Sequence, residues 1–348
     1  MGGQQSFPVL SLPRERIVII TGANTGLGYE TAKWIAMMGA TVIIGCRNEE
    51  RAFQAIERMK AEHKEIKESG KVELPNVDSL HVEFMPLDLT SFASTMSFVQ
   101  KFKATYSQLH VLICNAGVAL TPFAGKSNDG FETMLQVNYL SHFLLTAHLL
   151  PVLKLSGKDC RIVNVSSGAH SFSKFDLDTI NYSGDPQKFG RMDYYGRSKL
   201  YQVMQMYALN RRLKNSNVTI SCVHPGMVAT EIGRYSQDIP FGKMFFGACR
   251  LLACLEKTRS SAYAAKLSQS GLIKEPDDGA KTIINTAVNP DLSGIGCVYY
   301  VDCKPANTSA ASKNEAAQAA LWEYTLKELK SYLPEDIVYC LEGADPAS

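Results

Sequence analysis

The 348-residue chain lacks long hydrophobic runs, paired cysteines and a large net charge. Without an apolar stretch of about 20 residues, it has neither a predicted membrane span nor a secretory signal. Its nine cysteines are scattered and form no C-x-x-C pair, which argues against a metal site and favours a reducing, cytoplasmic compartment. A net charge of +2 predicts no nucleic-acid surface, so the expected partner is a small molecule.

What the sequence does contain is a glycine-spaced turn between a strand pattern and a helix pattern. A β-branched run at residues 17–20 precedes the turn, and a second apolar run at 42–44 follows the helical segment. Gly22 allows unusual dihedral angles, Gly26 admits a pyrophosphate, and Gly28 permits tight packing of helix on sheet. The helix starting near Gly26 directs free N–H groups at the phosphates. This pattern predicts a dinucleotide site; a tight turn that binds nothing is the alternative.

The order of elements predicts the fold class. Strand patterns occupy residues 80–87, 110–117, 161–168, 218–226 and 296–302, and helical patterns occupy 92–105, 130–155, 194–214, 277–288 and 316–332. Their repeated alternation favours an α/β fold, with a doubly wound, central parallel sheet and helices on both faces.

The turn reads T-G-x-x-x-G-x-G and resembles the cofactor turn of the short-chain dehydrogenase/reductase family. The phrases ANTGLGYETAK, CRNEERA, RIVNVSSGAH, YGRSKL, HPGMV and YYVDCK are similar to the retinol dehydrogenase and WW-domain oxidoreductase subgroup. The resemblance implies a single Rossmann-type domain over residues 14–332, between a flexible segment at 1–13 and a tail at 333–348. Implied cofactor contacts in the turn are Thr21, Gly22, Asn24, Thr25, Gly26, Leu27 and Gly28.

Four polar residues form the expected catalytic set. Tyr195 and Lys199 are four apart on a predicted helix and therefore share a face. A tyrosine pKa of about 10 makes a poor base, and we expect the ammonium and a cationic nicotinamide to favour the phenolate. The family resemblance implies that Ser167 holds the substrate oxygen, with Ser166 as the alternative, and that Asn138 organises a proton-relay water.

The end of the second strand bears on cofactor choice. No acidic residue precedes Glu49, and Arg47 is placed to accept a 2′-phosphate, so NADP(H) is predicted over NAD(H). Arg47 could instead pair with a surface glutamate. The family resemblance implies further cofactor contacts at Asp88, Leu89, Asn115, Ala116, Gly117, Tyr195, Lys199, Pro225, Gly226, Val228 and Thr230. Asp88 could instead cap the helix that follows it.

Two segments bear on lipophilic contacts. Within residues 227–276 the stretch PFGKMFFGACRLLACLEK (240–257) is rich in apolar residues, and we favour a substrate lid over plain core for the segment. The N-terminus matches M-G-x-x-x-S, so Gly2 is a candidate for myristoylation, with an unmodified N-terminus as the alternative. An acylated Gly2 together with the lid would give peripheral membrane contact. The homodimer that is usual in the family is left open.

These observations predict an NADP(H)-dependent oxidoreductase. Its expected reaction interconverts a lipophilic alcohol (retinoid-like, steroid or polyprenol-like) with the aldehyde or ketone by hydride transfer. The alternative is a catalytically weak NADP(H)-binding regulator or scaffold. A pure binder has no need of the full Asn-Ser-Tyr-Lys set, which favours the enzyme.

Overall fold

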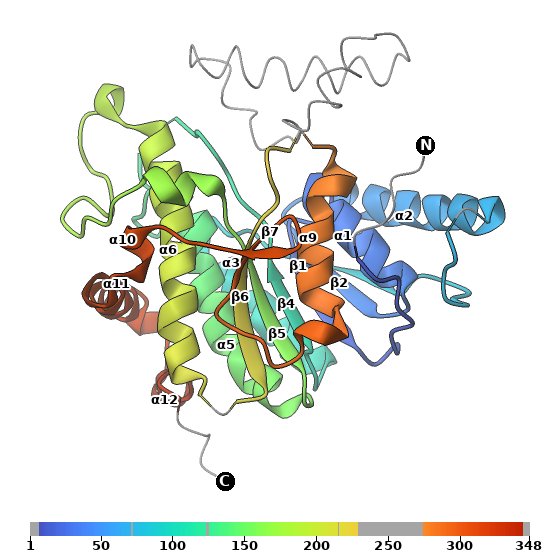
Figure 1. Cartoon of the computed structure of the whole chain (residues 1–348). Coiled ribbons are helices and arrows are strands. Elements are labelled where there is room, and N and C mark those ends of the chain that lie inside the picture. The colour runs from blue at the N-terminus through green and yellow to red at the C-terminus, as the bar shows by residue number, and fades with distance from the viewer. Residues whose placement is uncertain (1–6, 71, 123–124, 215, 229–273, 344–348) are drawn as a thin grey trace.

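The computed structural model describes residues 7–70, 72–122, 125–214, 216–228 and 274–343. In these ranges the strands form one sheet of order β3-β2-β1-β4-β5-β6-β7-β8, with helices on both faces (Figure 1). Strands β1 to β7 pair in parallel, and β8 joins antiparallel to β7. The order reverses between β1 and β4, so the predicted doubly wound α/β fold is confirmed. The strands are β1 (Ile17–Thr21), β2 (Thr41–Cys46), β3 (Val82–Pro86), β4 (Val111–Cys114), β5 (Cys160–Val165), β6 (Val218–His224), β7 (Tyr299–Val301) and β8 (Lys304–Ala306).

The helices cover the two faces as two groups. One core cluster gathers α1, α2 and α9, and the other gathers α3, α5, α6, α11 and α12. The strands supply both clusters by alternation: Ile19 faces one cluster, and its neighbours Val18 and Ile20 face the other. The helix bounds are α1 (Gly26–Met37), α2 (Glu49–Ser69), α3 (Phe92–Thr105), α4 (Thr133–Leu135), α5 (Ser141–Leu155), α6 (Arg191–Arg212), α9 (Pro276–Val288), α10 (Ala310–Lys313), α11 (Glu315–Glu328) and α12 (Glu335–Leu341).

Both predicted termini need correction. In the segment expected to be flexible at 1–13, the buried Phe7 ring meets Trp34 edge-on at 5.6 Å, and the Leu12 N–H donates to the Met38 carbonyl. In the predicted tail at 333–348, residues 335–341 form α12, and this helix buries Ile337 against the core. Each segment is too short for its periodicity to show that an apolar side chain is buried. Packing on distant elements orders residues 7–13 and 335–341.

The helix predicted over 130–155 is broken by a π-helical turn. Glu132 caps α4 by accepting from the N–H groups of Met134 and Leu135, and residues 136–140 then form the π-helix η1 (Gln136–Leu140) before α5 begins. Such turns often occur at functional sites, and this one contains Asn138.

Two other expectations concern residues outside the described ranges. They are the lid, apart from its ends at 227–228 and 274–276, and the acylation site at Gly2. None of the helices within the described ranges has both the length and the apolar character that crossing a bilayer requires.

Candidate active site

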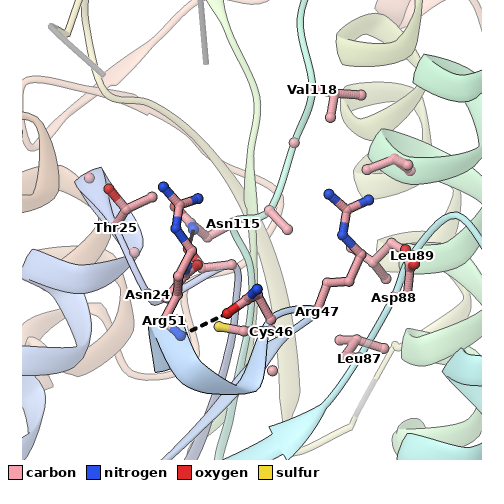
Figure 2. A pocket seen from close by; sticks show the side chains of 18 of the residues that line it. Asn24, Thr25, Cys46, Arg47, Arg51, Leu87, Asp88, Leu89, Asn115 and Val118 are labelled. Carbon is pink, nitrogen blue, oxygen red and sulfur yellow. Dashed lines mark hydrogen bonds between the residues drawn. The ribbon is translucent and has the colours of Figure 1, made fainter. Parts of the chain in front are cut away.

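A pocket of about 240 Å³ opens at the carboxyl ends of β1, β2, β3 and β4 (Figure 2). This is the edge at which open α/β sheets bind ligands. Its wall comprises Gly22, Asn24, Thr25, Gly26, Leu27, Gly28, Gly45, Cys46, Arg47, Asn48, Arg51, Leu87, Asp88, Leu89, Thr90, Asn115, Ala116, Gly117, Val118 and Val137. The structure thus brings most of the predicted cofactor contacts into one cavity.

The glycine turn has the backbone geometry that its sequence predicts. Gly22 and Gly26 adopt φ values of +68° and +58°, which glycine accepts readily. The Thr21 hydroxyl anchors the neighbouring strand end by accepting from the N–H groups of Asn115 and Ala116. Thr25 precedes α1 without capping it through its side chain, which leaves the first-turn N–H groups for an anion. The pocket therefore fits a dinucleotide phosphate.

Gly28→Ala is expected to lower both the melting temperature and the affinity for NADPH. A Cβ there would lie 2.5 Å from the Gly22 carbonyl oxygen and 2.9 Å from Ala23 Cα, and neither backbone atom can turn away. Overpacking of this kind costs about 1–3 kcal/mol, so Tm should fall by about 2–8 °C. Thermal unfolding with and without NADPH measures both effects. The control is Gly190→Ala, whose Cβ would meet only Asp193 Cβ at 3.4 Å; equal Tm values for the two variants would contradict the prediction.

Two arginines line the pocket beyond the end of β2. Arg47 is exposed there, and Arg51 follows it on the first turn of α2. Asn48 lies between them and caps α2 by accepting from the Arg51 N–H. Both arginine side chains extend in the same direction (Figure 2). Arg51 was not among the predicted cofactor contacts, because in the sequence it is one of many charged residues of the segment that forms α2.

Asp88 lines the pocket and also has a local role. Its carboxylate accepts from the N–H and hydroxyl groups of Thr90, at 2.9 and 2.8 Å. The helix that follows, α3, is capped by Ser91, which accepts from the Ser94 N–H. The alternative in which Asp88 caps this helix is therefore wrong.

Lys199 lies in α6 beside the inner end of the pocket. Its Nζ donates to the Val165 carbonyl at 2.9 Å and lies 5.9 Å from the centroid of the Tyr195 ring. A Cβ on Gly117, in the pocket wall, would be 3.5 Å from the same Nζ. Burial lowers the pKa of Lys199 to about 8. The ammonium is therefore largely charged at neutral pH.

Tyr195 lies close enough to Ser167 for the serine hydroxyl to affect the pKa of its phenol. Burial raises the pKa of the Tyr195 phenol, and a hydrogen bond with the Ser167 hydroxyl lowers it by a smaller amount. The protein side chains alone therefore hold this phenol protonated, because burial penalises the charged form. The expected shift toward phenolate includes the charge of the bound nicotinamide, so it stays a prediction.

The two serines after β5 face different ways. The Ser166 hydroxyl is buried and donates to the Lys199 carbonyl at 3.0 Å, so it is occupied in joining the strand to α6. Ser167, half-buried, accepts from the Ala169 N–H at 3.2 Å and meets Tyr195. Successive residues of an extended segment point to opposite sides. The geometry therefore brings Ser167, and not Ser166, to the phenol.

Asn138 fixes part of the pocket wall. Its Oδ1 accepts from the Val118 N–H and its Nδ2 donates to the Val118 carbonyl, both at 2.9 Å. The same Nδ2 donates to the Ser198 hydroxyl. Its backbone carbonyl accepts from Gln202 Nε2 at 2.9 Å. The structure thus shows Asn138 holding Val118 in place, and its role in proton relay stays a prediction.

The segment after β6 reaches the glycine turn. Gly226, next to Pro225, has φ +87°. A Cβ on Gly279 of α9 would lie 2.6 Å from both the Leu27 and Val228 side chains, so these two residues flank the same point. Thr230 lies outside the described residues.

The family model described as short chain dehydrogenase matches residues 16–239, more than half of the chain. The chain belongs to the short-chain dehydrogenase family. The predicted membership is confirmed, and this short-chain dehydrogenase is an oxidoreductase acting on CH–OH donors, in a family that binds a nicotinamide cofactor.

Relatives of this short-chain dehydrogenase match over most of its length. It is 37% identical over 320 residues to polyprenol dehydrogenase of Homo sapiens, covering 90% of this chain and 85% of the relative. It is 35% identical over 309 residues to retinol dehydrogenase 14 of Homo sapiens, covering 88% of this chain and 84% of the relative. The WW domain-containing oxidoreductase of Danio rerio is 34% identical over 318 residues, which cover 89% of this chain and 67% of the relative. The predicted subgroup resemblance is thereby confirmed.

Solved structures share the fold. An uncharacterised protein from Mycobacterium paratuberculosis matches with a TM-score of 0.64 at 27% identity, covering 92% of this chain and 96% of that one. A short-chain dehydrogenase from Escherichia coli CFT073, solved with NADPH, matches with a TM-score of 0.56 at 21% identity, covering 85% and 100%.

Proposed function

We propose that this short-chain dehydrogenase uses NADP(H) to interconvert a lipophilic alcohol with its aldehyde or ketone. The observation that carries the cofactor choice is the pair Arg47 and Arg51 in the pocket wall, at the position where an acidic side chain would serve NAD(H). Guanidinium groups bind phosphate through paired, charge-assisted hydrogen bonds. The NADPH-bound structural neighbour is consistent with this choice.

The proposed chemistry uses Ser167, Tyr195 and Lys199. When bound, the nicotinamide supplies or accepts the hydride. Ser167 donates a hydrogen bond to the substrate oxygen, and Tyr195 passes its phenolic proton to that oxygen during reduction and takes it back during oxidation. The Lys199 ammonium, held by the Val165 carbonyl, stabilises the phenolate that is left.

Exposed apolar side chains beside these residues support a lipophilic substrate. Met192 is 52% exposed and lies three residues before Tyr195, on the same side of α6. Phe172 is 92% exposed and ends the short helix η2 (Gly168–Phe172) that begins directly after Ser167. Relatives named for retinol and polyprenol point to the same substrate class. We propose that Phe172 and Met192 contact the apolar part of the substrate.

The paired substitution Phe172→Ser and Met192→Ser tests this assignment. We expect kcat/KM for a long-chain aldehyde to fall about tenfold, because apolar contacts of this size are lost. For propanal, which is too short to reach them, kcat/KM should stay within twofold. Steady-state kinetics with a series of aldehydes measures the ratio. The control is Leu155→Ser, which changes a 76% exposed leucine at the amino edge of the sheet; an equal loss for both aldehydes would contradict the assignment.

A further inference from the structure

We propose that His170 is a positioning residue for the Ser167 hydroxyl. The inference rests on the proposed function, in which Ser167 holds the substrate oxygen. His170 lies in η2, is 1% exposed, and places its Nδ1 2.8 Å from the Ser167 carbonyl oxygen. The backbone N–H of His170 donates to the same oxygen at 3.1 Å. Two donors of one residue thus converge on the backbone of the serine.

The surroundings of the ring determine which nitrogen carries the proton. The Ser309 backbone N–H points at Nε2 from 3.3 Å, and a backbone N–H can only donate. Nε2 must therefore accept, which leaves the proton of the neutral ring on Nδ1, facing the Ser167 carbonyl. Burial lowers the pKa of His170, so the neutral form is the one present at neutral pH.

The ring is also held on its other side. The Tyr299 ring of β7 packs against it with centroids 4.9 Å apart, and the Tyr299 hydroxyl lies 3.4 Å from Nδ1. His170 therefore joins three parts of the chain: β7, the segment after β8 that contains Ser309, and the end of β5 that carries Ser167. His170 contacts Ser167 and Ser309 through their backbone atoms, so the Ser167 hydroxyl is left for the substrate.

The hydrogen bond from His170 to the Ser167 carbonyl oxygen helps to position the Ser167 hydroxyl, because both groups belong to the same residue. Ser167 has extended dihedral angles, with φ −155° and ψ 153°, and its preceding residues belong to the sheet. On its other side the carbonyl is held by His170. We infer that releasing this carbonyl would leave the Ser167 Cα, which carries the hydroxyl, less firmly fixed relative to Tyr195, and small misplacements of a catalytic group cost large factors in rate.

His170→Phe removes the donor and keeps a ring against Tyr299. We expect kcat to fall about 10- to 100-fold, while the dissociation constant for NADPH stays within twofold, since among the described residues the hydrogen-bond and ring partners of His170 lie outside the pocket wall. A double-mutant cycle with Ser167→Ala separates positioning from general structural support. Without the hydroxyl nothing remains to be positioned, so His170→Phe should cost less than about twofold in the Ser167→Ala background.

A second pair of variants leaves the histidine in place. Ser309 has φ −65°, which proline accepts, and Ser309→Pro removes the N–H that donates to Nε2. Both Ser309→Pro and Ser309→Ala lose the side-chain cap on Ser312, and only the alanine variant keeps the N–H. We expect kcat to fall about fivefold for the proline variant and to stay near wild type for the alanine variant, with similar Tm values.

The outcomes separate the two proposals. Equal losses from His170→Phe with and without the Ser167 hydroxyl, or equal kcat for the two Ser309 variants, would overturn the positioning role and leave the proposed function standing. If Ser167→Ala itself leaves kcat unchanged, the proposed role of Ser167 fails and the positioning role fails with it.

Discussion

Tyr195→Phe is expected to lower kcat about 10³-fold in both reaction directions. The substitution removes one oxygen and leaves the ring, so the phenol proton can no longer pass to or from the substrate oxygen. Tyr195 contacts Ser167 and lies beside Lys199, and the wall of the cofactor pocket is built by other residues. The NADPH dissociation constant should therefore stay within threefold. Stopped assays of turnover and fluorescence titration of NADPH measure the two quantities.

The neighbouring tyrosine provides the matched control. Tyr194 is buried, and its hydroxyl donates to the Thr179 carbonyl at 2.9 Å, away from Ser167. Tyr194→Phe should lower Tm slightly and leave kcat within threefold. Turnover of the Tyr195 variant close to that of the wild type would sink the proposed mechanism, and loss of NADPH binding would show that this side chain shapes the cofactor site.

Replacing both Arg47 and Arg51 by alanine is expected to raise the NADPH dissociation constant about 10²- to 10⁴-fold and to change that of NADH by less than threefold. Each guanidinium that binds the 2′-phosphate contributes about 1.5–3 kcal/mol. NADH lacks that phosphate and loses nothing. Arg47→Ala alone should account for most of the change, because Arg47 follows β2 directly at the end that faces the pocket.

Lys64→Ala is the charge-matched control for the single variant Arg47→Ala. Lys64 lies on the same helix, α2, with a 78% exposed side chain, and pairs loosely with Glu68 at 3.9 Å. Its loss removes one positive charge without touching the pocket. Equal affinities of the wild-type protein for NADPH and NADH would instead support the NAD(H) alternative, and Arg47 would then be only a surface cation.

The predicted site residues differ in how far the sequence could place them. Gly22, Gly26 and Gly28 were identified from spacing, because their role is local: each permits a backbone approach within a single turn. The family resemblance favoured Ser167 over Ser166, and the coordinates add a physical reason, while the catalytic role stays a prediction. The two share residue type and neighbourhood in the sequence, and only their opposite directions in space separate them.

Arg51 and the ionisation of Tyr195 show a second limit. Arg51 looks like an ordinary surface residue of a charged helix until the helix is placed against the pocket. The pKa of Tyr195 depends on how much water surrounds it, and burial outweighs the nearby groups in raising it. A short sequence motif predicts neither the position of Arg51 in the pocket wall nor the pKa of Tyr195. Both depend on elements that are brought together only in the folded chain.

By itself the sequence determined the alternation of strands and helices, the glycine turn and the family, because periodicity and turn chemistry act over a few residues. Only the tertiary structure decided that Phe7 and α12 belong to the core, that η1 interrupts the helix at Asn138, and that His170 meets Ser309 across 139 residues. Contacts between residues so far apart in the sequence depend on how whole helices and strands pack. The sequence around either residue contains no local pattern that predicts which distant residue it contacts.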